Sequence, residues 1–202
     1  MKYFLVITIL CPSLILANDL SLMNVIAAPT YTYPAGSSEI EVFKPGSKEQ
    51  IELFEMAANE LGLPDAWAHS KGLQSILEKE GYTVGQPNYT YDNGSLAREL
   101  GVDRLSSPRN GAHWPKVWES LIKGQIRAKS TACGLGQLIN LNVDAFLQEY
   151  HQLGKSKDLA PYRRKYYGNP LMEACGMLWY IKGRYGTPTK AWKQYRTKFN
   201  GY

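Results

Sequence analysis

Signals for the start and end of helices recur from residue 47 to residue 202, and they restrict the fold class more than any other feature. Ser47 and Gln50 have the spacing of a capping box, and apolar residues then recur at helical intervals up to the next glycine. Pro64 suits the first position of a second helix, which we expect to reach about Glu80. Such closely spaced signals favour a domain of short helices.

Further helices are predicted in the second half of the chain. A stripe with two tryptophans predicts one over residues 114–122. A helix starting at Asn169 and Pro170 ends with basic residues before Gly186, and a last helix follows Thr187. The segment "TVGQPNYTY" is the best candidate for a short hairpin or extended loop. We therefore expect a mainly α domain of about six helices with one irregular or β insert.

The N-terminal segment reads as an export signal. Residues 1–17 carry one Lys and an apolar run of about fifteen residues, shorter than the roughly twenty that span a bilayer. Cleavage near residue 28, or retention as an uncleaved anchor, remains open. Residues 18–46 are rich in Pro, Gly and Ser and are predicted to form a linker or extended arm. The domain proper is expected at 47–202, in an exported protein.

Charge is distributed unevenly. Residues 151–202 carry eleven Lys and Arg against two acids, a net +9, which leaves −4 for the first 150 residues and gives the total of +5. A basic C-terminal third favours an anionic partner, such as nucleic acid, an acidic wall polymer or a membrane surface. A solvated basic face that has no partner explains the same pattern.

Cysteine and histidine positions bear on disulfides and metals. Outside the signal segment the cysteines are Cys133 and Cys175, which would either form one disulfide or be two buried thiols. His69, His113 and His151 lie far apart without the spacing of metal ligands. With no phosphate-binding or dinucleotide fingerprint either, we expect no metal and no cofactor.

The predicted second helix ends near two acids that lie on different faces. With Leu73 at zero and about 100° per residue, Ile76 and Leu77 place the apolar stripe near zero, Glu80 falls at about 340° and Glu78 at about 140°. Glu80 therefore lies on the apolar side, where partial desolvation raises the pKa of a carboxyl group and favours a general acid. The alternative is an exposed acid at a frayed helix end.

Four sequence blocks carry a resemblance to a known family. Glu80 is followed by "GYTVGQPNYTY", and later come "STACGLGQL" at 130–138, "LINLNVDAF", and "YIKGRYGTP" at 180–188. This ordered set resembles the lytic transglycosylases of the lysozyme superfamily, most closely phage and bacterial members, over about residues 60–202. The resemblance implies a lysozyme-like helical fold that acts on peptidoglycan.

The resemblance also implies a mechanism with one carboxyl group. Glu80 would protonate the β-1,4 glycosidic oxygen between N-acetylmuramic acid and N-acetylglucosamine. As a carboxylate it would then remove the proton of the muramoyl C6 hydroxyl, giving a 1,6-anhydro product. Hydrolysis by a muramidase is the alternative, with Asp92 or Asp144 as the second carboxylate that such enzymes use.

Substrate-binding positions follow from the same match. Gly134 and Gly136 would let the backbone approach the sugar, and Gln137 would donate to and accept from it; a tight helix crossing is the alternative role for the glycines. The full set implied is Ser130, Gly134, Leu135, Gln137, Tyr180, Asn88 and Tyr89. Two departures from the family pattern are Gly81, where many members have Ser, and Ala191–Trp192, which lacks the following Asn.

Other function classes stay open. A catalytically silent wall-binding or virion structural protein would keep the cleft without cleaving the glycan. A nucleic-acid-binding module would use the basic last third, where "PYRRKYY" interleaves cations and aromatics. The expected partner is peptidoglycan, with wall or envelope contact through the basic third. We expect a monomer in the periplasm, outside the cell or on a virion.

Overall fold

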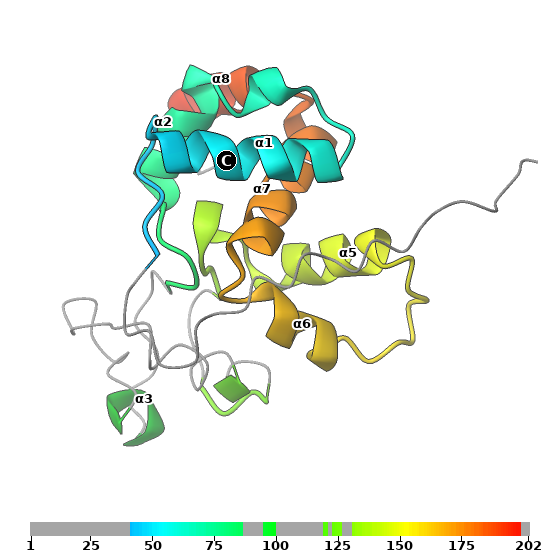
Figure 1. Ribbon diagram of the computed structural model, residues 1–202. Coiled ribbons are helices and arrows are strands. Elements are labelled where there is room, and N and C mark those ends of the chain that lie inside the picture. Colours follow the sequence, from blue (N-terminus) through cyan, green and yellow to red (C-terminus); the bar gives the residue numbers. More distant parts are fainter. Residues whose placement is uncertain (1–40, 87–94, 100–118, 121–122, 127–130, 199–202) are drawn as a thin grey trace, which may run out of the picture. The chain divides into compact units, whose positions relative to one another are not determined.

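The computed structural model describes residues 41–86, 95–99, 119–120, 123–126 and 131–198 (Figure 1). These residues are mainly helical, as predicted, and in place of strands they contain two isolated bridges, Val42–Thr83 and Cys133–Leu138. The signal segment, most of the linker and most of the helix expected at 114–122 lie outside the described residues.

The α-helices are α1 Lys48–Glu60, α2 Lys71–Glu80, α3 Ser95–Glu99, α5 Asn140–Tyr150, α6 Ala160–Tyr166, α7 Pro170–Tyr185 and α8 Pro188–Lys198. Two short 3₁₀ turns complete the set, η1 Asp65–Trp67 and η3 Leu135–Gln137.

Side-chain caps explain where most helices begin. The Ser47 hydroxyl accepts the Gln50 N–H at 3.2 Å, and the Asn169 side chain accepts the Met172 N–H at 3.1 Å, which starts α1 and α7 where the sequence predicts. Thr187 caps α8 in the same way. Gly186, with φ of 80°, ends α7. The caps of these three helices were therefore readable from sequence.

The prediction of one helix from Pro64 to Glu80 is wrong. The chain makes only the η1 turn, and α2 begins at Lys71 because the Ser70 hydroxyl accepts the Gly72 N–H at 3.2 Å. The Ala68 carbonyl between them accepts the Gln50 side-chain amide at 3.4 Å. Local polar contacts thus separate the turn from the helix.

Helix α7 forms the centre of the core. Residues 170–178 are buried on every side, and α7 packs against α1, α5, α6, α8 and η3. In Figure 1, α7 (orange) runs between α1 and the α5–α6 pair. Phe54, Phe146 and Tyr166 are large, fully buried side chains of this core. A helical segment with apolar residues on nearly every face, such as 170–178, is expected to lie inside a protein.

Helix α8 supports α2. Gly72 lies so close to α8 that a Cβ atom there would be 2.6 Å from the Pro188 carbonyl oxygen. Only a residue without a side chain permits this packing. The helix that ends in Glu80 is therefore held against the last helix of the chain.

The end of the predicted linker belongs to the folded domain. The Phe43 N–H donates to the Tyr82 carbonyl at 2.8 Å, and the Val84 N–H donates to the Glu41 carbonyl at 3.1 Å. The packed domain thus starts by residue 41 rather than residue 47. Among the described helices, none is both long and apolar enough to cross a membrane.

Candidate functional site

Glu80 is the last residue of α2 and is partly buried, whereas Glu78 is exposed. This is the difference that the helical spacing predicts. The helix ends at Gly81, whose N–H donates to the Leu77 carbonyl at 2.9 Å. Glu80 therefore lies where a rigid helix gives way to the loop 81–86, with its side chain neither in the core nor fully in solvent.

The segment 134–137 lies along the loop that follows Glu80. The Gly136 N–H donates to the Gly81 carbonyl at 3.1 Å, and the Gly134 N–H donates to the Gln86 carbonyl at 3.0 Å. Both ends of the loop are thus bound to the same short segment. Gly136 is therefore hydrogen-bonded to the residue directly after Glu80.

The backbone and the surroundings of Gly81 explain why this position is a glycine. Its φ is 153°, a conformation that residues with a side chain rarely adopt. A Cβ atom there would also lie 3.0 Å from the Gln137 side-chain nitrogen. A serine at this position would strain the backbone and crowd Gln137.

The hydrogen bonds of the Gln137 side chain lie within the protein, whereas the prediction gives them to the substrate. Its Nε2 donates to the Gln86 carbonyl at 3.0 Å and to the Gly134 carbonyl at 2.9 Å, so both amide protons are bound within the protein. Its Oε1 is buried and has no hydrogen-bond partner within the described part of the chain. Gln137 therefore holds the shape of the segment through both of its side-chain amide protons.

Gly134 and Leu135, two of the predicted substrate-binding residues, contact the interior of the protein in the structure. A Cβ atom on Gly134 would lie 2.2 Å from Oε2 of Glu173, so this glycine lets the backbone approach a carboxylate of the protein. The Leu135 side chain is fully buried in the core. The close approach that the glycine predicts exists, but its partner is internal.

Glu173, which the sequence reasoning did not single out, is the centre of this contact. Its carboxylate is completely buried and accepts the N–H of Gly85 at 3.0 Å, of Leu135 at 3.0 Å and of Gly168 at 2.8 Å. Burial raises the pKa of Glu173 to about 7, against the lowering effect of these three amides, and the charge of Glu41 raises it further. One side chain thus joins three separate loops.

A signal for Glu173 was present in the sequence. It is the single acid in the apolar run "PLMEACGMLW", where a helix has no polar face to place it on. An acid in such a helix must be buried and must find donors. Gly134 permits the close backbone approach, and Gly85 and Gly168 supply two of the donors.

The two cysteines are buried thiols that are not joined to each other, so the disulfide alternative is wrong and the buried-thiol alternative holds. The Cys133 thiol donates to the Gly85 carbonyl at 3.1 Å, which adds a further link between the two loops. The Cys175 thiol lies 3.9 Å from the Ala57 carbonyl, and burial raises its pKa to about 12. Cys175 is therefore protonated and unreactive at neutral pH.

Helix α8 brings aromatic residues toward Glu80. Burial raises the pKa of the Tyr195 phenol, and the charge of Glu80 raises it further, so the two groups are electrostatic neighbours. The Trp192 ring stacks on Tyr195 at 5.4 Å between centroids, and Arg196 lies over Trp192 at 5.8 Å. Sequence reasoning had noted Trp192 but missed Tyr195, although a spacing of three places both on one helix face.

Tyr180 lies farther along α7. Its hydroxyl accepts from Arg184 Nη1 at 2.8 Å, and its ring meets Tyr185 edge to face at 6.2 Å. Seven residues separate it from Glu173, or roughly 10 Å along a helix axis. The other predicted substrate residues, Ser130, Asn88 and Tyr89, lie outside the described residues.

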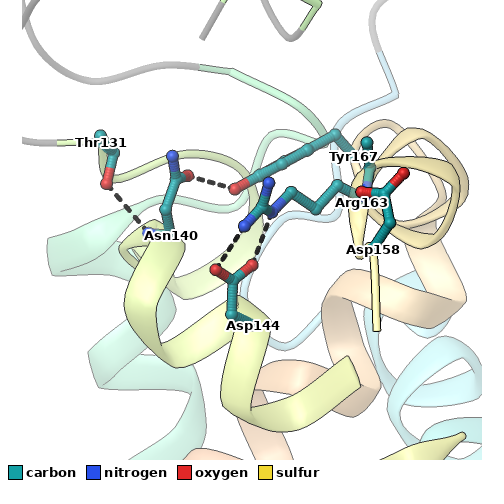
Figure 2. A network of polar contacts seen from close by, with 7 residues as sticks. Thr131, Asn140, Asp144, Asp158, Arg163 and Tyr167 are labelled. Carbon is teal, nitrogen blue, oxygen red and sulfur yellow. Dashed lines mark hydrogen bonds and ion pairs between the residues drawn. The ribbon is translucent and has the colours of Figure 1, made fainter. Parts of the chain in front are cut away.

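Asp144, a candidate second carboxylate, belongs to a separate polar network (Figure 2). Arg163 binds it in two places, Nε to Oδ1 at 2.6 Å and Nη2 to Oδ2 at 2.5 Å. Beside it the Tyr167 hydroxyl donates to the Asn140 side chain, and the Thr131 hydroxyl accepts the Asn140 N–H at 2.9 Å. Asp144 is therefore engaged in holding α5 to α6. Asp92 lies outside the described residues.

Two of the three histidines, His69 and His151, lie in the described residues and have ordinary surroundings, whereas His113 lies outside them. His69 is bound to Glu55 at 2.8 Å, and His151 packs between Tyr150 and Tyr162. Across the described ranges, no group of three or more His, Cys, Asp or Glu side chains is arranged to hold a metal ion. Comparison of the chain with protein-family models, with curated proteins and with solved structures gave no match.

Proposed function

We propose that this protein is a peptidoglycan lytic transglycosylase with a lysozyme-like helical domain and that Glu80 is its single catalytic acid and base. The observation that carries the proposal is the position of Glu80. It is partly buried at the end of α2, and the Gly81–Gly136 hydrogen bond joins that end directly to the glycine-rich segment. A general acid needs this combination of partial desolvation and access to substrate.

The proposed reaction uses Glu80 twice. As an acid it protonates the glycosidic oxygen between N-acetylmuramic acid and N-acetylglucosamine, which lets the leaving sugar depart. The resulting carboxylate removes the proton of the muramoyl C6 hydroxyl, whose oxygen attacks the anomeric carbon. A 1,6-anhydro end forms, no water is consumed, and Glu80 is protonated again.

Tyr195 and Gln137 would assist Glu80. The charge of Glu80 acts on the phenol of Tyr195, so this phenol would be near enough to donate a hydrogen bond to the carboxylate after Glu80 has given up its proton. Gln137 would act indirectly, by fixing the shape of the glycine-rich segment through its two side-chain hydrogen bonds.

Hydrolysis by a muramidase is the runner-up. It needs a second carboxylate to act as nucleophile or base. Asp144 is a poor candidate because both of its oxygens are bound to Arg163. A hydrolase would therefore have to use Asp92 or another acid, and the transglycosylase reaction needs none.

The proposed partner is peptidoglycan, which the protein would meet after its export or on a cell attacked by a phage. Exposed cations of α8, among them Lys190, Lys193 and Arg196, would add attraction to the anionic wall. A catalytically silent wall-binding or virion protein would use the same surface without cleavage.

The test is product analysis by mass spectrometry after incubation of the purified protein with peptidoglycan. We expect anhydro-muropeptides; reducing ends would indicate a hydrolase, and intact wall would indicate the silent binder. Glu80→Gln should lower the release rate at least about 100-fold, since acid–base groups contribute 10²–10⁴-fold. Glu78→Gln, two residues away and exposed, is the matched control and should retain full activity.

A further inference from the structure

We infer that Glu173 is the positioning residue of this site: its buried carboxylate fixes the loop 81–86 against the segment 134–137 and so sets where Glu80 meets the glycan. The inference rests on the proposed function for its catalytic consequence. Its structural part, the amide clamp, stands independently of any activity.

The first step of the argument is the donor set. The amides bound by Glu173 come from three places that are distant in sequence: Gly85 in the loop after Glu80, Leu135 in the glycine-rich segment, and Gly168 before α7. Gly85 and Gly168 lie outside the helices, and Leu135 only begins the three-residue η3 turn. A buried carboxylate with several charge-assisted hydrogen bonds constrains these segments.

The second step is the route from Glu173 to Glu80. Leu135 is bound to Glu173, and its neighbour Gly136 donates to the carbonyl of Gly81, the residue directly after Glu80. From the other side, Gly85 is bound to the same carboxylate four residues beyond Gly81. The loop that leaves Glu80 is therefore held at both ends.

The third step excludes a role in packing alone. A buried apolar residue would fill the space at 173 more easily, because burial of a carboxyl group is unfavourable without its donors. Gly134 must also lack a side chain for the carboxylate to fit. The sequence thus keeps an acid and a glycine at two core positions where larger apolar residues would pack.

The experiment compares two variants of α7 in the full-length protein. Glu173→Gln keeps the size of the side chain but turns an NH₂ group toward backbone donors. Met177→Ala, one turn farther along and equally buried, removes core packing without touching the clamp. Glu173→Asp, which keeps the charge on a shorter stem, replaces Glu173→Gln if that variant does not fold.

Two readouts are measured at a temperature where near-UV circular dichroism shows each variant folded. We expect hydrogen exchange of the Gly85 and Leu135 amides, followed by NMR, to accelerate at least about tenfold in Glu173→Gln relative to Met177→Ala. We expect kcat on soluble glycan strands, per folded molecule, to fall at least about tenfold with KM changed less than twofold. Glu173→Asp should recover part of both losses.

Each outcome decides one question. Equal kcat per folded molecule in Glu173→Gln and Met177→Ala would overturn the positioning role, and unchanged exchange of the two amides would overturn the clamp itself. If the unaltered protein releases nothing from glycan while exchange responds to Glu173→Gln, the proposed function fails and the clamp stands.

Discussion

Glu80 and Glu173 are joined through the same loop, yet their surroundings differ in every respect. Glu80 is partly exposed at the end of a helix, with the phenol of Tyr195 nearby. Glu173 is fully buried at the start of α7 and is surrounded by backbone amides. An acid that exchanges protons with a substrate must remain accessible. An acid that fixes loops must be enclosed and satisfied by donors.

The comparison teaches that burial alone does not identify a catalytic acid. The pKa of Glu173 is raised to about 7, in the range expected for a general acid, but its oxygens face only protein. The accessible group is the better candidate for catalysis. Glu173, the group with the raised pKa, is the better candidate for a structural role.

The largest loss of stability is expected at Gly134, which lies closest to the Glu173 carboxylate. Gly134→Ala would place a Cβ atom 2.2 Å from the carboxylate, at a φ of 74°, and should destabilise the protein by about 4 kcal/mol from overpacking and backbone strain. Urea unfolding measures this. Gly186→Ala has a φ of 80° and open space around it, so it should cost only about 1 kcal/mol. Equal losses would show that the contact with Glu173 contributes nothing.

The pH dependence of stability should reveal the titration of Glu173. Because its pKa is about 7 in the folded protein and 4.5 for an ordinary glutamate in water, the folded state holds the proton more tightly. The stability that this tighter proton binding adds to the folded state is therefore fully present below pH 4.5. About 3 kcal/mol of unfolding free energy is lost as the pH rises through 7. Glu173→Gln cannot titrate. The difference in unfolding free energy between the two proteins should change by this amount between about pH 4.5 and 8, and a constant difference would contradict it.

Asp144 is a third carboxylate to compare with Glu80 and Glu173. It is bound by the Arg163 cation instead of by backbone amides. Asp144→Asn removes a bidentate pair whose side chains are only 23% and 25% exposed, and should cost about 1 kcal/mol of stability. Glu52→Gln breaks the exposed Lys48 pair and is the control, with an expected change within about 0.5 kcal/mol. Thermal unfolding compares them. A loss of muropeptide release in Asp144→Asn would instead favour a hydrolase.

The smallest effect on stability should come from substitution of Glu80. Glu80→Gln removes the proposed catalytic group from a partly exposed helix end, so the unfolding free energy should stay within about 0.5 kcal/mol of the original. Urea titration of the variant used in the activity test measures this. A loss above about 2 kcal/mol would place Glu80 with Glu173 among the acids needed for folding.

Much of the helical framework follows from local signals. Ser47, Asn169 and Thr187 cap their helices as predicted, because capping depends on residues within one turn. The break before α2 was missed because Ser70 reads equally well as a helical residue or a cap. Helical spacing also separated Glu80 from Glu78 correctly.

The candidate site was only partly predictable. The sequence indicates that Gly134 permits a close approach, but not that the approaching group is Glu173, 39 positions later. Gln137 was expected to face the substrate, and its amide protons are bound within the protein. Contacts between distant segments decide both cases, and periodicity and caps carry no information about them.

The packing of Gly72 on Pro188 makes the C-terminal helix part of the support for Glu80. Proteolysis or truncation before residue 187 would remove no proposed catalytic residue, yet it would uncover one flank of α2 and withdraw Tyr195 from the acid. Inactivation by loss of the C-terminus would then resemble a catalytic defect while leaving Glu80 in place.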